Sequence, residues 1–424
     1  MDKIVVIGGK KLEGVVEISG SKNATLPIMA ACLLTGEKCV IKNVPEIRDV
    51  FTMIRVLNTL GAKIYIAGNE LTIDPSNIVC YEAPYELVKT MRASFLVLGP
   101  LLARFGKSRV SLPGGCAIGP RPVDIHLKGF KALGAEIEMG HGDIKASCSG
   151  RLKGNKVVLD YPSVGATENI MMAATLAQGK TVIENAACEP EIIDLAKFLI
   201  SMGAKIEGSG TNTITISGSR RRSLKGATHK MIADRIEAGT FMIGAAITDG
   251  NVLIKNCDYS HHIALISKLE EAGVKVKQEK DGIRITKAGD FKPVKIKTMP
   301  YPGFPTDIQA QFMVLLSITS GQSVVTETVF ENRFIHVAEI NRMGANIRIE
   351  GDNALIEGVP FLTGAHVMAS DLRASAALII AGLVAHGETH IHRVYHLDRG
   401  YEKIESKLSG LGAMINRISG DTIQ

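Results

Sequence analysis

Apolar and polar positions alternate along the chain in one recurring order. Residues 30–35 form an apolar, alanine-containing run, Gly36 follows, and residues 38–43 alternate between apolar and polar. An amphipathic run, a second glycine and two more alternating stretches complete the pattern. Periods of 3.6 and 2 residues are typical of helices and strands, respectively. Each segment of about 70 residues therefore predicts a helix, a strand, a second helix and two more strands.

Two series of glycines mark the ends of these predicted helices. In the first series the intervals are 68 to 73 residues, and its members are Gly61, Gly134, Gly203, Gly273, Gly344 and Gly412. The second series keeps step with the first and comprises Gly36, Gly106, Gly179, Gly250, Gly321 and Gly387. Glycine just after a helix usually takes a left-handed backbone conformation, and we expect both series there. Six copies of one unit are therefore predicted.

Six such units could form a ring, a solenoid or two groups of three. Their length exceeds the roughly 20–50 residues of solenoid and propeller repeats, and the polar stretch 217–226 separates the third unit from the fourth. We place the domain change there. The N-terminal strands, residues 3–7 and 14–19, are expected to complete the sixth unit. Residues 1–21 and 230–424 would then form one α/β domain, and residues 22–229 the other.

Composition narrows the class of protein. With 424 residues, 46% of them hydrophobic and 22% charged, the chain fits a globular protein with a large core. The longest apolar run, residues 374–385, is shorter than the ~18–20 residues of a membrane span. The N-terminal apolar run of four residues is too short for a signal sequence, and seven cysteines without C-x-x-C spacing argue against a disulfide framework. We expect a cytoplasmic protein without membrane insertion.

The net charge of +6 is a mild excess that suits an anionic small molecule at least as well as nucleic acid. Three consecutive arginines, residues 220–222, are a candidate nucleic-acid patch, but no aromatic residues are interleaved with them. A solvated linker is the simpler interpretation. His390, His392 and His396 form a conceivable metal site, but no thiol or carboxylate completes it convincingly. We predict neither a metal nor a nucleic-acid partner.

A stretch rich in glycine and proline, residues 112–122, connects a predicted strand to a predicted helix at residues 123–133. Its glycines and prolines exclude regular structure. Cys116 lies in this loop, and Arg121 follows between Pro120 and Pro122. Loops of this kind serve as lids, and an exposed thiol is an oxidative risk that proteins usually avoid. The alternative is an ordinary surface loop with an incidental cysteine.

Cations occupy equivalent positions at the starts of three apolar helices, at Lys22, Arg92 and Arg373. A cation at a helix N-terminus opposes the helix dipole and costs stability unless an anion binds there. Helix caps with solvated side chains are the alternative interpretation. Asp307 opens the helix of another unit, where it is either a dipole partner or a general base beside the cations.

Three further arginines fall in loops that follow predicted strands: Arg121, Arg333 and Arg399. Guanidinium groups bind carboxylate and phosphate in a bidentate manner. Several arginines in equivalent loops therefore indicate a substrate that carries both groups.

Six motifs resemble those of one enzyme family. They are Gly-Ser-Lys-Asn-Ala (20–24), Met-Arg-Ala-Ser (91–94), Leu-Pro-Gly-Gly-Cys-Ala-Ile-Gly-Pro-Arg-Pro-Val-Asp (112–124), Ser-Val-Gly-Ala-Thr-Glu-Asn (163–169), Phe-Pro-Thr-Asp (304–307) and Asp-Leu-Arg-Ala (371–374). Over essentially the whole chain, they are similar to the UDP-N-acetylglucosamine 1-carboxyvinyltransferases, a family of enolpyruvyl transferases. The resemblance implies a two-domain inside-out α/β barrel of six repeats, three per domain and packed helices-inward, with the substrates in the cleft between the domains.

The resemblance also implies an activity. The enzyme would transfer the enolpyruvyl group of phosphoenolpyruvate to the 3-hydroxyl of UDP-N-acetylglucosamine by addition and elimination, with release of phosphate and without a cofactor. This is the first committed step of peptidoglycan synthesis, on which cell-wall biogenesis, cell shape and cell division depend. One alternative is 5-enolpyruvylshikimate-3-phosphate synthase, against which the cysteine loop and Asn23 speak. The other is a catalytically silent regulatory paralogue, which would be expected to lack the thiol or the base.

Roles for individual residues follow from the same resemblance. Cys116 would be the proton donor and could add covalently to phosphoenolpyruvate, and Asp307 would accept the proton of the sugar hydroxyl. Lys22 and Arg399 would complete the catalytic set by binding the donor. The implied substrate-binding residues are Lys22, Asn23, Arg92, Arg121, Pro122, Val123, Asp124, Ile125, Ser163, Val164, Gly165, Asp307, Val329, Arg333, Asp371, Arg373 and Arg399. Tyr161 stands where some relatives carry lysine, and no ligand role is assigned to it.

Overall fold

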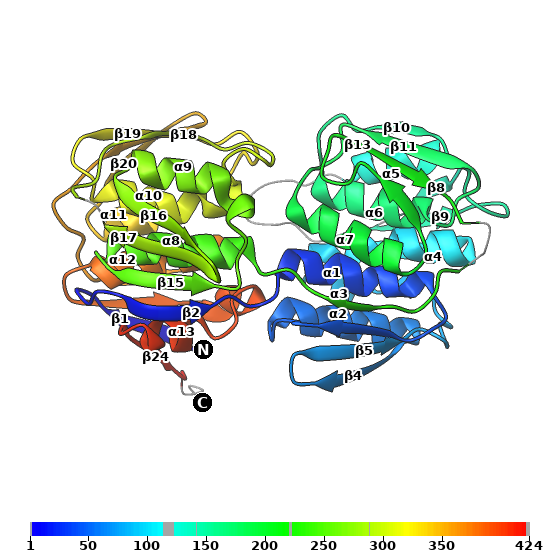
Figure 1. Ribbon diagram of the computed structural model, residues 1–424, viewed down its shortest axis with the longest axis horizontal. Coiled ribbons are helices and arrows are strands. Elements are labelled where there is room, and N and C mark those ends of the chain that lie inside the picture. The colour runs from blue at the N-terminus through cyan, green and yellow to red at the C-terminus, as the bar shows by residue number, and fades with distance from the viewer. Residues whose placement is uncertain (1, 113–122, 141, 220–222, 288, 421–424) are drawn as a thin grey trace. The chain divides into compact units, whose positions relative to one another are not determined.

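The structure is a computed structural model that describes residues 2–112, 123–140, 142–219, 223–287 and 289–420 (Figure 1). The described residues form two compact units. We call the one with residues 2–19 and 233–420 the terminal unit, and the one formed within residues 20–232 the central unit. The chain passes between them at residues 19–20 and 232–233, and the boundaries predicted from the sequence lie after residues 21 and 229.

Three four-stranded sheets lie on the outside of the central unit, with helices between them (Figure 1). Their strand orders are β14-β3-β5-β4, β6-β7-β9-β8 and β10-β11-β13-β12. The strands are β3 (Cys39–Lys42), β4 (Lys63–Ala67), β5 (Glu70–Asp74), β6 (Glu82–Ala83), β7 (Lys107–Ser111), β8 (Glu136–Met139), β9 (Asp143–Ser147), β10 (Lys156–Val158), β11 (Lys180–Glu184), β12 (Lys205–Glu207), β13 (Thr213–Ser217) and β14 (Thr228–Lys230). The helices are α1 (Lys22–Ala31), η1 (Cys32–Leu34), α2 (Arg48–Leu60), α3 (Tyr85–Val88), η2 (Arg92–Val97), α4 (Leu98–Phe105), α5 (Asp124–Ala132), α6 (Val164–Ala174) and α7 (Pro190–Ser201).

The terminal unit repeats this plan with strand orders β16-β17-β15-β2, β18-β19-β21-β20 and β22-β23-β1-β24. Its strands are β1 (Lys3–Ile7), β2 (Glu13–Glu17), β15 (Asn251–Lys255), β16 (Val274–Glu279), β17 (Gly282–Lys287), β18 (Lys295–Lys297), β19 (Gln322–Thr326), β20 (Asn346–Glu350), β21 (Asn353–Glu357), β22 (His366–Met368), β23 (Glu388–His392) and β24 (Met414–Ile418). Its helices are α8 (Arg235–Ile247), η3 (Tyr259–His262), α9 (Ile263–Glu271), η4 (Thr306–Ile308), α10 (Gln309–Ser317), α11 (Val337–Arg342), α12 (Leu372–Val384), η5 (Val394–Arg399) and α13 (Ile404–Gly410).

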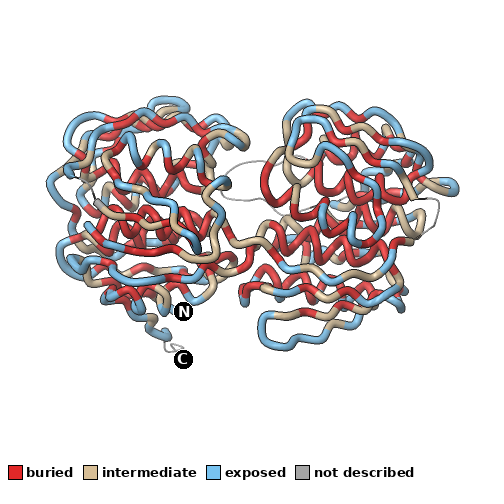
Figure 2. Tube along the Cα trace, in the orientation of Figure 1, coloured by how far each residue is buried: buried red, intermediate tan, exposed pale blue. Residues whose placement is uncertain are grey.

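The apolar helices form the core of each unit. Every residue of α6 from Ala166 onward is buried, and so is every residue of α12 from Arg373 to Leu383. Helix α6 packs on α1 and α4, and α12 packs on α8 and α10; Figure 2 shows these inner helices as buried and the outer loops as exposed. A helix that is apolar all round is stable only when it is buried on most sides. The predicted α/β fold, with three repeats packed helices-inward in each unit, is confirmed.

The two N-terminal strands join different sheets. Strand β1 pairs antiparallel with β23 and β24, so it enters the sheet of the sixth repeat as predicted. Strand β2 instead pairs in parallel with β15 of the fourth repeat, so the expectation for residues 14–19 is wrong. Strand β14 pairs in parallel with β3 of the first repeat in the same way. Each segment next to a chain passage therefore supplies an edge strand to the unit in which it lies.

Most of the repeated glycines have the predicted backbone conformation. All six of the first series have φ between 83° and 108°, whereas Gly36 and Gly250 of the second series are not left-handed. Asp249 takes the left-handed position before Gly250, with φ of 54°. A Cβ on Gly250 would lie 2.3 Å from the carbonyl oxygen of Leu12. Glycine is required there by the close approach of two backbones rather than by a helix cap.

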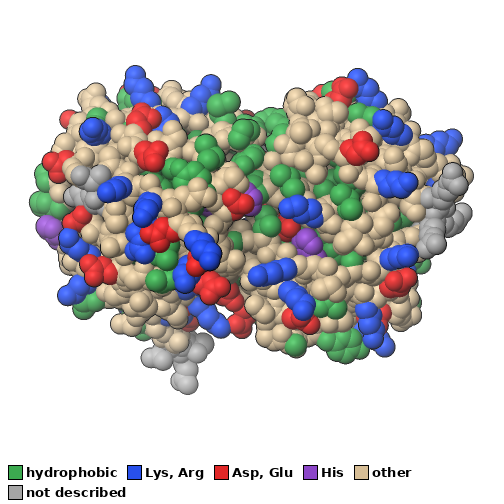
Figure 3. Space-filling view, in the orientation of Figure 1, with side chains coloured by type: hydrophobic (Ala, Val, Ile, Leu, Met, Phe, Trp, Pro, Cys, Tyr) green, Lys and Arg blue, Asp and Glu red, His purple; other side chains and the backbone are tan. Residues whose placement is uncertain are grey.

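The lengths of the described helices and the charges on one face of the surface can be compared with the predictions about partners. No helix among the described residues is long and apolar enough to cross a bilayer. On the face shown in Figure 3, Lys and Arg side chains are interspersed with Asp and Glu over both units. Such mixing is typical of a solvated surface.

A partly buried charge cluster holds the chain where it leaves the terminal unit. The Ser19 N–H donates to Oε2 of Glu237, and the Asp234 N–H donates to the Ser19 carbonyl, both at 2.9 Å. Lys407 Nζ lies 2.6 Å from both Glu237 Oε1 and Ser19 Oγ, and Ser19 Oγ also bonds to Glu402. Burial raises the pKa of Glu237 to about 7, and Lys407 opposes this increase only in part.

Glu237→Gln is expected to remove a pH-dependent loss of stability. The carboxyl pKa is 4.5 in its ordinary state and about 7 in the folded chain. Between these values the unfolded chain releases a proton that the folded chain keeps, so the free energy of unfolding falls by about 3 kcal/mol as pH rises. In urea titrations the variant should gain about that amount relative to wild type between about pH 5 and pH 8. A difference that is equal at both pH values would contradict this role; Glu13→Gln, at an exposed position of β2, is the matched control for the substitution.

Candidate active site

The starts of two inner helices and the turn before α11 bring one carboxylate and two arginines together in the terminal unit. Asp307 lies in η4, directly before α10, and Arg373 is the second residue of α12. Arg333 Nη2 lies 2.7 Å from Asp307 Oδ1, and Arg373 Nη2 lies 3.0 Å from Asp307 Oδ2. Each carboxylate oxygen thus accepts a hydrogen bond from a different guanidinium group. Three of the predicted site residues are in direct contact.

The two arginines are enclosed, whereas the carboxylate is partly open. The side chains of Arg333 and Arg373 are 4% and 5% exposed, compared with 28% for Asp307. Burial opposes the charge of Arg373, but Asp307 and then Tyr401 outweigh it and raise the pKa of Arg373 above its ordinary value. This arrangement leaves the carboxylate accessible to a substrate while fixing its orientation from behind.

Asp371 caps the helix that carries Arg373. Its Oδ1 accepts hydrogen bonds from the backbone N–H groups of Arg373 at 2.8 Å and Ala374 at 3.1 Å. Burial works against its charge, but these donors and Arg333 hold the pKa of Asp371 below its ordinary value. The structure therefore gives Asp371 the task of fixing the start of α12; its contact with a substrate stays a prediction.

Glu327 is a buried residue that connects two segments of the site, and it was not predicted from the sequence. It is 4% exposed, and its carboxylate accepts four hydrogen bonds. Oε1 accepts from Thr298 Oγ1 and the Val329 N–H at 2.8 Å and from the Phe330 N–H at 3.2 Å, and Oε2 accepts from Thr306 Oγ1 at 2.8 Å. Because Thr306 belongs to η4, Glu327 joins the turn that carries Asp307 to the segment of Val329.

Three more buried polar residues lie behind the carboxylate: Thr240 of α8, Gln311 of α10 and Tyr401 after η5. The Tyr401 hydroxyl lies 2.9 Å from Thr240 Oγ1 and 3.3 Å from Gln311 Nε2. Arg373 Cζ lies 5.6 Å from the centre of the Tyr401 ring. Burial raises the pKa of Tyr401, although Arg373 and Thr240 oppose this increase. These residues were also missed, because a lone Gln or Thr in an apolar helix has the pattern of a core position.

In the central unit, the predicted cations again begin helices. Ser21 caps α1 by accepting the Ala24 N–H at 3.3 Å, so Lys22 and Asn23 are the first two helical residues. Arg92 is the first residue of η2, which leads into α4. The predicted positions at helix starts are confirmed; the ligands of these cations stay a prediction.

His126 connects two of the predicted substrate-binding segments of the central unit. Burial, followed by the charge of Arg92, lowers the pKa of His126 to about 3, so the imidazole is neutral. Asn169 Nδ2 lies 3.3 Å from His126 Nδ1, and an amide nitrogen can only donate, so the proton is on Nε2. A Cβ on Gly165 would lie 3.4 Å from His126 Cε1. The imidazole therefore lies beside Gly165 at the start of α6, where the charge of Arg92 also acts on it.

The remaining predicted residues fall in several places. Val123 precedes α5, whose first two residues are Asp124 and Ile125. Arg399 ends the short helix η5, and the Asp398 carboxylate beside it pairs with Arg417 at 2.5 Å. Three predicted residues lie outside the described residues: Cys116, Arg121 and Pro122.

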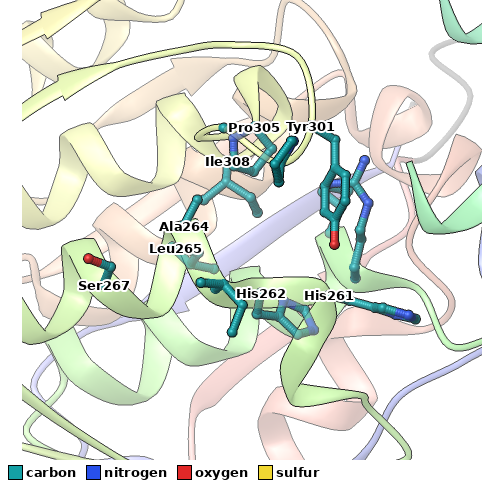
Figure 4. A pocket seen from close by; sticks show the side chains of 13 residues that line it. His261, His262, Ala264, Leu265, Ser267, Tyr301, Pro305 and Ile308 are labelled. Carbon is teal, nitrogen blue, oxygen red and sulfur yellow. The ribbon is translucent and has the colours of Figure 1, made fainter. Parts of the chain in front are cut away.

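A cavity of about 420 Å³ lies beside the Asp307 turn in the terminal unit (Figure 4). Pro305 and Ile308 line it, but Asp307 does not. Arg235, the first residue of α8, also lines it, with its guanidinium 5.6 Å from the centre of the Tyr301 ring. Arg235 is a cation at the helix start of the fourth repeat and was missed, although the equivalent positions in other repeats are the signal that could have found it.

The histidines of β22 and β23 pair with neighbours. His390 Nε2 lies 3.3 Å from Glu388 Oε2, and His366 Nδ1 lies 3.2 Å from His392 Nε2. His396 lies apart from these strands, in η5. In the part of the chain that the structure describes, no group of three or more His, Cys, Asp or Glu is arranged to hold a metal ion.

Comparisons with known proteins agree with one another. The family EPSP synthase (3-phosphoshikimate 1-carboxyvinyltransferase) matches residues 6–408. The chain is 60% identical over 421 residues to UDP-N-acetylglucosamine 1-carboxyvinyltransferase 2 of Carboxydothermus hydrogenoformans, covering 99% of this chain and 100% of the relative. It is 56% identical over 422 residues to UDP-N-acetylglucosamine 1-carboxyvinyltransferase of Koribacter versatilis, covering 99% and 97%. Among solved structures, the enolpyruvyl transferase NikO of Streptomyces tendae shares the fold with a TM-score of 0.89, 24% identity and 99% coverage of each chain.

Proposed function

Because the chain belongs to the UDP-N-acetylglucosamine 1-carboxyvinyltransferases, within the wider EPSP synthase family, we propose that it transfers the enolpyruvyl group of phosphoenolpyruvate to the 3-hydroxyl of UDP-N-acetylglucosamine. The reaction proceeds by addition and elimination and releases phosphate. The observation that carries the proposal is the partly open carboxylate of Asp307, held between Arg333 and Arg373. Such a carboxylate can accept a hydroxyl proton beside groups that bind anions.

The reaction begins when Asp307 accepts the proton of the sugar hydroxyl and the oxygen attacks the central carbon of phosphoenolpyruvate. Cys116 gives a proton to the methylene carbon, which produces a tetrahedral intermediate. Loss of phosphate, and of a proton from the new methyl group, then gives the enolpyruvyl ether. Lys22 and Arg399 stabilise the negative charges of the donor during both steps.

Residues of both units are assigned to the two substrates. Lys22 and Asn23 bind phosphoenolpyruvate, together with Arg121 and Arg399. Arg92 and the starts of α5 and α6 bind the UDP-sugar, with Ser163, Val164 and Gly165 at its nucleotide end. His126 lies at the start of α6, and the charge of Arg92 acts on it. This proximity supports a single binding surface that includes Arg92 and the start of α6.

We place the enzyme in the cytoplasm, at the first committed step of peptidoglycan synthesis, where it contributes to cell shape and division. The names of the similar proteins support the enzymatic step; the location and the contribution to cell shape and division are part of the proposal. Cys116 is also proposed to add to phosphoenolpyruvate and form a covalent adduct, since a loop thiol is a nucleophile when deprotonated.

EPSP synthase is the second candidate, because that family matches most of the chain. The EPSP synthase of Acinetobacter baumannii shares the fold with a TM-score of 0.76 but only 18% identity over 99% of this chain and all of that one. The 60% identity to a UDP-N-acetylglucosamine 1-carboxyvinyltransferase favours the first candidate. A silent paralogue is disfavoured because Asp307 and Cys116 are both present.

A phosphate-release assay tests the proposed reaction. Release is expected only when UDP-N-acetylglucosamine and phosphoenolpyruvate are both present, because phosphate leaves only after the sugar oxygen has added. Shikimate 3-phosphate should not replace the UDP-sugar. Release with shikimate 3-phosphate would favour EPSP synthase, and no release under either condition would favour the silent paralogue.

A further inference from the structure

A buried polar network joins helices α8 and α10 to the segment that follows η5, and the proposed reaction does not use its members directly. Thr240 is 1% exposed, Gln311 0% and Tyr401 3%. Burial of polar groups costs free energy unless they are hydrogen-bonded in good geometry. These three residues are therefore stable in the apolar core only when they are arranged so that they hydrogen-bond.

The donor and the acceptor can be assigned for the hydrogen bonds of this network. The Thr240 hydroxyl donates to the Ile236 carbonyl at 2.8 Å, so its oxygen accepts the Tyr401 hydroxyl at 2.9 Å. Gln311 Nε2 lies 3.2 Å from Thr240 Oγ1, 3.3 Å from the Tyr401 oxygen and 3.2 Å from the Asp307 backbone carbonyl. The amide nitrogen thus faces three acceptors. The Asp307 carbonyl can only accept, so the amide group of Gln311 turns its nitrogen, and not its oxygen, toward that carbonyl.

The network contacts Asp307 and Arg373, two residues of the proposed site. Gln311 holds the backbone of Asp307 through its carbonyl. The Tyr401 ring lies under the guanidinium of Arg373, which bonds to the Asp307 carboxylate at 3.0 Å. Asp307 is thus held at its backbone by one member and at its carboxylate through the other.

We propose that Gln311, Tyr401 and Thr240 are positioning residues that fix the Asp307 carboxylate and the Arg373 guanidinium in the reactive arrangement. The inference rests on the proposed function, in which Asp307 accepts the sugar proton. A small displacement of a catalytic group can cost about 100-fold in rate even when the displaced group itself is unchanged.

Tyr401→Phe tests the proposal, because it keeps the ring beneath Arg373 and removes only the hydroxyl. We expect kcat for phosphate release to fall about 10- to 100-fold, with KM for both substrates nearly unchanged. Thr240→Val should have the same effect, because it removes the acceptor of the Tyr401 hydroxyl. Thr240→Ser retains that acceptor, so its kcat should stay close to that of wild type. The double variant Tyr401→Phe/Thr240→Val should be no slower than either single variant, since both break one linked unit.

The outcomes separate this proposal from the proposed function. If wild type releases phosphate with both substrates but Tyr401→Phe keeps its kcat and only its melting temperature falls, the network is structural and the positioning role is overturned. Independent, multiplicative losses in the double variant would overturn it as well. If wild type itself releases no phosphate, the proposed function fails, and the positioning role fails with it.

Discussion

Asp307→Asn is expected to lower kcat for phosphate release by about 10²- to 10⁴-fold, which is the usual contribution of a positioned general base. Asparagine keeps the size of the side chain but cannot take up the proton of the sugar hydroxyl. KM for UDP-N-acetylglucosamine should change less, because Arg333 and Arg373 remain in place. Steady-state kinetics at saturating phosphoenolpyruvate measures both parameters.

The same substitution removes the counter-charge of two enclosed guanidinium groups. Arg333 and Arg373 are 4% and 5% exposed, and Asp307 is 28% exposed. We therefore expect a loss of about 3 kcal/mol in the free energy of unfolding, at the low end for a broken buried ion pair. Asp352→Asn, in the exposed turn between β20 and β21, is the matched control. A variant that loses stability but retains the wild-type kcat would assign Asp307 a structural role only.

Local signals account for the features that the sequence predicted correctly. An apolar run and the glycine after it depend on neighbours in the chain, so the inner helices and their left-handed ends are recognisable without knowledge of the fold. The same holds for the cations at the helix starts, Lys22, Arg92 and Arg373. Regular spacing of these signals then predicts six repeats, and the polar stretch 217–226 predicts their division into two groups of three.

Contacts between distant segments account for what was missed. The alternating pattern of residues 13–17 identifies a strand but not its partner, which is β15 rather than a strand of the sixth repeat. Glu327 takes its donors from segments on both sides of α10, and Gln311 meets Tyr401 across 90 residues of sequence. A polar residue in an apolar helix cannot be assigned a role until the group it faces is known.

Cys116→Ser is expected to slow turnover sharply, within the 10²- to 10⁴-fold range of general acid catalysis. Serine offers a hydroxyl of similar size, but a hydroxyl is a far weaker acid than a thiol, whose pKa is about 8.5 in model peptides. Protonation of the methylene carbon should then limit kcat, whereas the affinity for UDP-N-acetylglucosamine should be nearly unchanged. A normal kcat in this variant would end the proton-donor role of Cys116.

Thiol alkylation checks the same residue independently, because the described cysteines are poor competitors. Cys32 and Cys39 are buried, so a reagent cannot reach them. Burial raises the pKa of three others and lowers their thiolate fraction: Cys148, Cys188 and Cys257. Cys80 is partly exposed, and Cys80→Ser serves as the control. Iodoacetamide should inactivate wild type and Cys80→Ser equally but leave the residual activity of Cys116→Ser unchanged; loss of that residual activity at the wild-type rate would locate the essential thiol elsewhere.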